Sequence, residues 1–283
     1  MPDVAALATE KEQVLGSAEF AWLLSAHAAD VHIRLNTIRE IHVMSDLITT
    51  VIEAHGGLHR YNRFTSVTAH LRVGGSLWRL KGQEGILSQA AVRLDLHRQH
   101  ASHYPFTAPH LRSSFTAKRV AVESAAGDVK ADRFDPRASF PADVHSPWDD
   151  LHVAYFAGYA MWTYFTSPFI FSSPGFEAAE LSPHTEEGEE WKRLKVTFPD
   201  HIATHCPVQI FYFDSNGLLR RHDYTPEVIN AGPAAHYPSE YRSSMESWFR
   251  PGGGSSGGDR TERCPGTSNS SPSTSKMSCS PER

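Results

Sequence analysis

Hydrophobic and polar residues alternate one by one along several stretches of the chain. The segments "SVTAHLRV" (66–73) and "AVRLDLHRQ" (91–99) place apolar side chains at every second position, which is the period of a strand with one buried face. A Gly-Gly pair follows the first segment, and "LWRLKG" (77–82) is expected to continue as strand. Two more runs flank Ala126–Asp128, as in a hairpin. Such alternation is typical of antiparallel sheets, so residues 66–137 are predicted to form one.

The strand pattern returns between residues 190 and 224. "EWKRLKVTFP" directs Leu194, Val196 and Phe198 to one face. "PVQIFYFDSNGLLRRHDY" indicates two strands joined by a turn at 214–217, where Asp, Asn and Gly are the residues that turns prefer.

The stretch "DLHVAYFAGYAMWTYFTSPFIF" (150–171) is packed with aromatic residues and interrupts this pattern. Asp149 and Asp150 favour the start of a helix and Pro168 ends it. The helix is apolar nearly all round, which predicts burial nearly all round. Its tyrosines and polar interruptions distinguish it from the roughly 20 mostly aliphatic residues of a membrane span, so we expect no span. The predicted fold is therefore mainly β (α+β): a curved antiparallel half-barrel sheet covered by this buried aromatic-rich helix.

A second helix is predicted in "MSDLITTVIEAHGGLHRYNRF" (44–64), capped by Ser45 or Asp46 and stopped at Gly56-Gly57. This pattern is typical of a domain start, and it begins at a methionine, Met44. Our hypothesis is therefore that Met44 is the native start and that residues 1–43 form an N-terminal extension that is not native, or else a dispensable arm.

The half-barrel domain is assigned to residues 44–248, and its C-terminal end is expected to be truncated. Residues 249–283 are rich in Gly, Ser, Pro and Thr, a composition that cannot bury enough apolar surface to order itself. The alternative to a disordered tail is a frameshift near Met245. GC-rich codons for "SWFRPGGG", read two bases later, would encode a strand-like string.

Composition narrows the function classes. The chain has 283 residues, is 40% hydrophobic and 21% charged, and carries a net charge of −5, so no nucleic-acid partner is indicated. Its three cysteines form no CxxC pair, which argues against a disulfide framework or a zinc site. The start lacks a basic region before an apolar run, so a cytoplasmic location is expected, although the cysteine count suits export as well. The oligomeric state is left open.

Catalytic and metal-binding motifs are scarce. The chain contains no GxSxG, GxxxxGK[ST], GxGxxG or HExxH, so no catalytic residue and no cofactor is predicted. "HIATHC" offers His201, His205 and Cys206, but the prolines around it predict a loop, and no metal site is assigned. His222 and Asp223 adjoin on a strand and should point to opposite faces.

Three strings support a family resemblance: "IEAHGGLHRYNRF", "HVAYFAGYAMWTYFTSPF" and "FYFDSNGLLRRHDY". They resemble a bacterial family, over about residues 44–248, that is similar to the LolA/LppX superfamily of lipoprotein-carrier folds. The resemblance implies a curved antiparallel sheet closed by helices over an apolar cavity. The chain departs from exported LolA-like carriers because no signal peptide or lipoprotein cysteine is visible near its start, which weakens the case for a periplasmic role.

We therefore expect non-catalytic binding of a lipid or another apolar small molecule in the half-barrel cavity. The alternatives are a hydrolase-like enzyme with His and Asp residues at the cavity mouth, or a structural domain with a filled core. The candidate ligand-binding residues are the aromatic and histidine side chains of the helix together with one tryptophan before it: His152, Tyr155, Phe156, Tyr159, Trp162, Phe165 and Trp78.

Overall fold

The computed structural model describes residues 46–239, 241 and 277–281. The chain divides into two compact units, Met1–Leu47 and Ile48–Arg283, and the fold and site described below belong to the second. The extension 1–43 lies outside the described residues, as does the tail apart from 277–281. The proposed domain boundaries therefore stay predictions.

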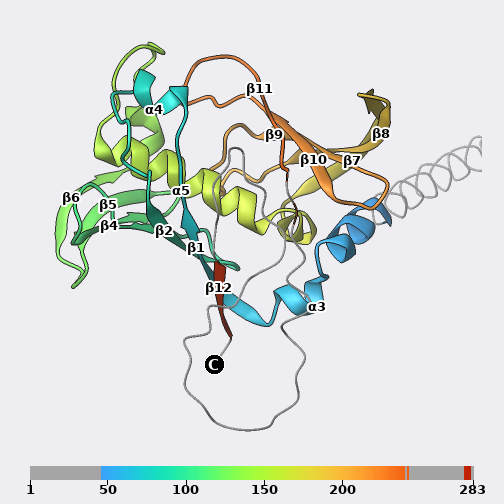
Figure 1. The fold of residues 1–283 in the computed structure, drawn as a ribbon, viewed down its shortest axis with the longest axis horizontal. Coiled ribbons are helices and arrows are strands. Elements are labelled where there is room, and N and C mark those ends of the chain that lie inside the picture. The colour runs from blue at the N-terminus through green and yellow to red at the C-terminus, as the bar shows by residue number, and fades with distance from the viewer. Residues whose placement is uncertain (1–45, 240, 242–276, 282–283) are drawn as a thin grey trace, which may run out of the picture. The chain divides into compact units, whose positions relative to one another are not determined.

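Two antiparallel sheets dominate the second unit (Figure 1). The seven-stranded sheet has the order β12-β1-β2-β3-β4-β5-β6, and the five-stranded sheet has the order β11-β10-β9-β8-β7. The first sheet contains β1 (Phe64–Leu71), β2 (Ala90–Asp95), β3 (Ala101–Tyr104), β4 (Leu111–Phe115), β5 (Arg119–Ser124), β6 (Val129–Phe134) and β12 (Met277–Pro281). The second contains β7 (Glu177–Glu186), β8 (Glu189–Thr197), β9 (Val208–Phe213), β10 (Leu219–Tyr224) and β11 (Ala234–His236).

The residues that the structure describes contain few helical segments. Residues 46–54 are helical, and the backbone amide of Gly57 donates to the carbonyl oxygen of Ile52, which closes that helix at the predicted Gly-Gly stop. The other helical elements are α3 (Leu58–Tyr61), α4 (Ser76–Leu80), α5 (Asp150–Thr166) and the 3-10 turns η1 (Pro136–Ser139) and η2 (Phe169–Ser172). The mainly β, α+β class is confirmed, with hydrogen bonding that divides the strands into two sheets.

Alternation correctly identifies the buried faces of the strands. Val67 pairs with Leu94 and Ala69 with Val92 across β1 and β2, and all four side chains are buried. The side chains between them stay on the wetter face, as an antiparallel sheet covered on one side requires. In β8, the predicted inward residues Leu194 and Val196 are fully buried.

Helix α5 is the buried aromatic helix that the sequence predicts. It packs on the face of the seven-stranded sheet formed by β2 to β6 (Figure 1). The Asp149 carboxylate accepts from the backbone amide of His152, and the His152 imidazole accepts from the amide of Asp149, which makes a capping box. Gly158 faces the ring of Phe115, where a larger residue would collide. Among the described residues, no helix has the length and apolar character needed to cross a membrane.

Two segments differ from the expected strand pattern. Residues 77–80 belong to helix α4 and do not continue a strand, since Gly75 has a φ of 123° and redirects the chain. In a strand, Trp78 and Leu80 would share a face, whereas the helix buries Trp78 and leaves Leu80 40% exposed. Strand β7 was not predicted, because a register shift between Leu181 and His184 breaks its alternation.

Two short strands also escaped prediction. Strand β11 has three residues, which is too short for a periodic signal. Strand β12 pairs antiparallel with β1 and lies in the stretch expected to be a disordered or frameshifted tail. Its pairing runs through the backbone, so its sequence "MSCSP" gives little warning of a strand.

Candidate functional site

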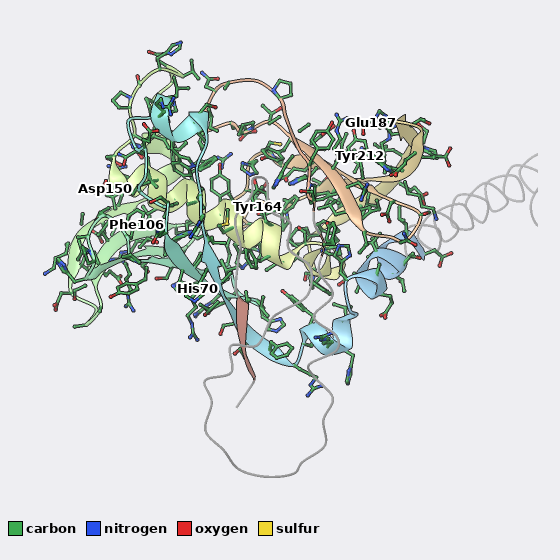
Figure 2. All side chains as sticks on the ribbon, in the orientation of Figure 1. His70, Phe106, Asp150, Tyr164, Glu187 and Tyr212 are labelled. Atoms are coloured by element: carbon green, nitrogen blue, oxygen red, sulfur yellow. The ribbon has the colours of Figure 1, made fainter. Side chains whose placement is uncertain are left out.

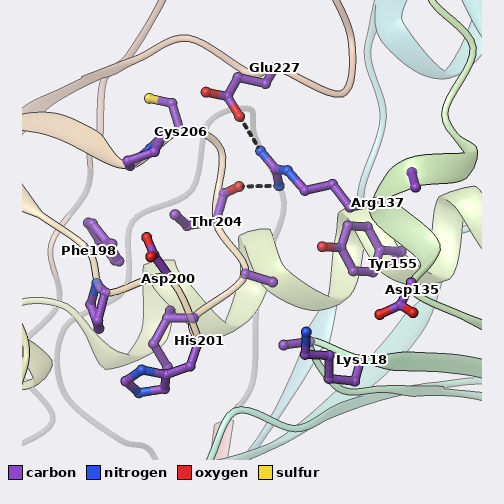
Figure 3. Close-up of a pocket in the computed structure, with 16 residues that line it drawn as sticks. Lys118, Asp135, Arg137, Tyr155, Phe198, Asp200, His201, Thr204, Cys206 and Glu227 are labelled. Atoms are coloured by element: carbon purple, nitrogen blue, oxygen red, sulfur yellow. Dashed lines mark hydrogen bonds and ion pairs between the residues drawn. The ribbon is translucent and has the colours of Figure 1, made fainter.

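A cleft of about 470 Å³ opens between the two sheets' connecting segments (Figure 3). Its residues come from the β4–β5 turn, the segment around η1, helix α5, the loop after β8 and the loop after β10. Apolar residues and charged residues both line it: Ala117, Lys118, Asp135, Arg137, Ala138, Tyr155, Phe198, Pro199, Asp200, His201, Ile202, Ala203, Thr204, Cys206, Pro207 and Glu227.

The loop between β8 and β9 forms one wall and is held in place by a buried glutamine. The side chain of Gln99 donates to the carbonyl oxygen of Ala203 (2.7 Å) and accepts from its amide (2.8 Å). The amide of Phe198 donates to the carbonyl oxygen of Pro207, which closes the base of the loop. These bonds satisfy backbone groups that would otherwise be buried without partners, so this wall has a defined shape.

Arg137 joins the two walls. Its Nη1 donates to the carbonyl oxygen of Thr204 (2.8 Å), and its Nη2 donates to that of His205 (3.2 Å) and to Glu227 Oε2 (2.5 Å). The turn that carries Arg137 starts at Asp135, whose φ of 45° is in the left-handed region that Asp tolerates. Two carbonyl oxygens thus fix the orientation of the guanidinium, and one carboxylate balances its charge.

Tyr155 is the residue of α5 that reaches the cleft. Its side chain is 1% exposed and lies beside Arg137 (Figure 3). Burial raises the pKa of the Tyr155 hydroxyl, while the neighbouring positive charge of Arg137 opposes that rise. The hydroxyl therefore stays protonated at neutral pH and can donate.

A buried polar cluster of Tyr164, His205 and Tyr224 lies behind this wall. Tyr164 Oη hydrogen-bonds to His205 Nε2 (3.0 Å) and to Tyr224 Oη (2.9 Å), and the rings of His205 and Tyr224 stack at 3.9 Å (Figure 2 labels Tyr164). Burial lowers the pKa of His205 to about 3, so its imidazole is neutral. Tyr164 belongs to α5 and Tyr224 to β10, so this uncharged cluster connects the helix to the five-stranded sheet.

The candidate residues from the sequence lie in different surroundings. His152 serves the capping box and donates from Nε2 to the carbonyl oxygen of Ser139 (3.0 Å). Phe156 packs edge-on to Trp78, and both are buried in the core. Trp162 Nε1 donates to the carbonyl oxygens of Asp95 and Arg98.

Tyr159 and Phe165 complete the set. Tyr159 is fully buried against His205, and Phe165 is half-buried near the end of α5. The structure thus places Tyr155 in the cleft wall and the other six candidates outside its lining. Their role in ligand binding stays a prediction.

In the described part of the chain, neither His201 nor His205 is hydrogen-bonded to a carboxylate. Figure 3 marks no hydrogen bond from His201 to Asp200 or to another lining residue of the described part of the chain. His222 is buried and bonds to Gln209, whereas Asp223 bonds to Arg221 and Tyr212, so the predicted opposite faces are confirmed.

The "HIATHC" segment is a loop, as its prolines predict. Its two histidines diverge, since His201 is exposed and His205 is buried. Within residues 46–239, 241 and 277–281, no group of three or more His, Cys, Asp or Glu side chains is placed to hold a metal ion.

Sequence reasoning missed the charged residues of the cleft. Arg137, Lys118 and Glu227 belong to turns and loops, where periodicity carries no information, and they come together only through the tertiary fold. The available signal is local: "FDPRASF" puts a cation directly after an Asp-Pro turn.

No protein-family model and no curated protein matches the chain. Among solved structures, the chain is similar to a LolA superfamily protein from Nitrosomonas europaea, with 9% identity, 71% of this chain and 80% of that chain covered, and a TM-score of 0.38. It is also similar to a DUF1329 family protein from Desulfovibrio piger, with 8% identity, coverage of 64% and 78%, and a TM-score of 0.30.

A third similar structure is the lipoprotein LppX from Mycobacterium tuberculosis, with 13% identity, coverage of 62% and 86%, and a TM-score of 0.22. LolA superfamily and LppX proteins, to which the three sequence strings point, are thus among the structural neighbours of the chain.

Proposed function

We propose that the protein binds a lipid or another apolar small molecule, without catalysis, in the cleft beside Tyr155. The observation that supports this proposal is the cleft of about 470 Å³, which joins carbon surface from Phe198, Pro199 and Ile202 to charged groups, among them the fixed guanidinium of Arg137. This combination and this size are those of small-molecule sites in general. Of the candidate residues from the sequence, Tyr155 lines this cleft, and the ligand-binding role of the others stays a prediction.

An alkyl chain is the simplest occupant. It would contact the apolar side chains that line the cleft: Ala117, Phe198, Pro199, Ile202 and Pro207. Each methylene that leaves water for such a surface contributes about 0.8 kcal/mol. The carbonyls of the loop wall are already bonded to Arg137 and Gln99, so binding a chain there leaves few backbone groups without partners.

The test is saturable binding of a neutral apolar dye, Nile red, followed by its fluorescence. The variant Ala138→Trp places an indole in the cleft from an exposed position and should weaken dye binding severalfold. Ala126→Trp is the matched control, because Ala126 is exposed in the β5–β6 turn and does not line the cleft.

Native mass spectrometry of freshly purified protein extends the test to natural ligands. A bound apolar mass that the Ala138→Trp variant loses would support the proposal. Dye binding that is absent, or equal in the two tryptophan variants, would overturn it.

A further inference from the structure

The charge on Arg137 has one partner among the residues described. The guanidinium contacts the carbonyl oxygens of Thr204 and His205, which carry no formal charge, and the carboxylate of Glu227. The Arg137 side chain is 35% exposed and lines the cleft. A cation in this position therefore remains accessible to a ligand that enters the cleft.

The side chain of Glu227 can move away from Arg137 while its backbone stays in place. The amide of Glu227 donates to the carbonyl oxygen of His205 (3.1 Å), which fixes the main chain. The carboxylate is 49% exposed and, in the described part of the chain, has an ion pair with Arg137 alone. A half-exposed ion pair of this kind contributes little to stability.

The surroundings of Arg137 suit an incoming anion. The Tyr155 side chain lies beside the guanidinium on the side of α5 (Figure 3) and is buried, so its hydroxyl can supply a second donor in a site of low dielectric. A guanidinium presents paired N–H groups that match the oxygens of a carboxylate or phosphate. Lys118 adds a positive charge to the lining, and Asp135 and Asp200 add negative ones.

Resting on the proposed function, we infer that the ligand of the cleft carries an anionic head group whose oxygens replace the Glu227 carboxylate on Arg137. Carboxylates and phosphate monoesters share this chemistry. The exchange keeps Arg137 paired at every stage, since one carboxylate-like group leaves as another arrives. The apolar part of the ligand then lies along the carbon surface of Phe198 and Ile202.

Three competitors with one common alkyl chain test the head group. Laurate, lauryl alcohol and laurylamine are titrated against protein loaded with Nile red. Laurate is expected to displace the dye at the lowest concentration, and its advantage over the alcohol should shrink as salt is added. Dodecyl phosphate, run in parallel, distinguishes a phosphate preference from a carboxylate preference.

Glu227→Gln is the decisive variant, because it keeps the size of the side chain and a hydrogen-bond acceptor for Arg137 while removing the competing charge. It should raise the affinity for laurate by about threefold to tenfold and leave lauryl alcohol unchanged. Glu190→Gln is the control, since it removes the same charge from an exposed position of β8 outside the cleft. Arg137→Lys should lower the affinity for laurate selectively, with urea unfolding used to confirm that the variant is folded.

Each outcome of these titrations either supports or overturns the anionic head group. Equal laurate affinities in the Glu227→Gln and Glu190→Gln variants, or tighter binding of laurylamine than of laurate, would overturn the anionic head group while the proposed function stands. If neither the dye nor any alkyl compound binds, the proposed function fails and this inference fails with it.

Discussion

Gly158 of helix α5 lies directly against the ring of Phe115 at the end of β4. Both residues are buried, and a Cβ at position 158 would overlap the phenyl group. The close approach of helix and sheet therefore depends on a residue without a side chain, although glycine is a poor helix former.

Replacing Gly158 by Ala should destabilise the protein. The gain in helix propensity, about 1 kcal/mol, is smaller than the overlap, so a net loss of about 1–3 kcal/mol in the free energy of unfolding is expected. Urea denaturation measures it. The double variant Gly158→Ala with Phe115→Leu should recover part of the loss relative to the sum of the single changes, and strict additivity would show that the two residues do not interact.

The start of α5 offers a second test. Asp149 caps the helix and also pairs with Arg133 (2.6 Å), whereas the carboxylate of its neighbour Asp150 forms no hydrogen bond or ion pair with the residues that the structure describes. Asp149→Ala should cost about 0.5–2 kcal/mol in thermal or urea unfolding.

Asp150→Ala is the matched control and should change stability far less. Burial and the neighbouring Asp149 raise the pKa of Asp150, so the surroundings disfavour the ionised form of its carboxyl group. A loss at Asp150 equal to that at Asp149 would contradict the capping role.

Buried histidines predict how stability depends on pH. Burial lowers the pKa of His103 to about 4 and that of His205 to about 3, from a usual value near 6.5. Between these pH values and 6.5, each imidazole is protonated in the unfolded chain but neutral in the folded protein. The free energy of unfolding therefore falls as the pH falls through this range. From pH 7 to pH 5 each group should remove about 2 kcal/mol.

Urea midpoints at several pH values check this prediction. His103→Asn should reduce the loss of stability between pH 7 and pH 5 by about 2 kcal/mol, the share of one group, because other buried imidazoles such as those of His205 and His222 remain. His201→Gln is the control, since His201 is exposed on the cleft loop and its replacement should leave the slope as it was. A midpoint that does not change between pH 7 and pH 5 would be inconsistent with neutral buried imidazoles.

The sequence predicts those features of the structure that depend on neighbouring residues, and it misses those that depend on contacts between distant ones. Alternation located the buried faces of β1, β2 and β8, and the aromatic run located α5 with its cap at Asp149, because these signals are local. The register shift in β7 hid that strand, since one extra residue reverses which positions face inward.

The site was harder to predict for the same reason. Arg137 and Glu227 are 90 residues apart in sequence, and neither lies in a periodic element. The aromatic residues of α5 were expected to line a pocket, but the capping box holds His152, and core packing buries Phe156 against Trp78. Tyr155 belongs both to the residues predicted from the sequence and to the lining of the cleft.

A buried lysine supports the loop that leads into α5, and its removal gives the last prediction. Lys81 is fully buried, donates from Nζ to the carbonyl oxygen of Val144 (2.6 Å), and lies 5.1 Å from the centre of the Trp148 ring. The amide of Trp148 in turn donates to the carbonyl oxygen of Lys81. These contacts fix the segment just before the helix cap.

Lys81→Met keeps the apolar stem of the side chain but removes the donor, leaving the Val144 carbonyl without this partner. The expected cost is about 1–3 kcal/mol, together with faster hydrogen exchange in residues 143–149. Lys118→Met, at an exposed position of the β4–β5 turn, controls for the loss of a charge and should leave exchange in that segment unchanged. If exchange at 143–149 is the same in the two variants, Lys81 does not hold the loop, and the entry into α5 depends on the Asp149 cap alone.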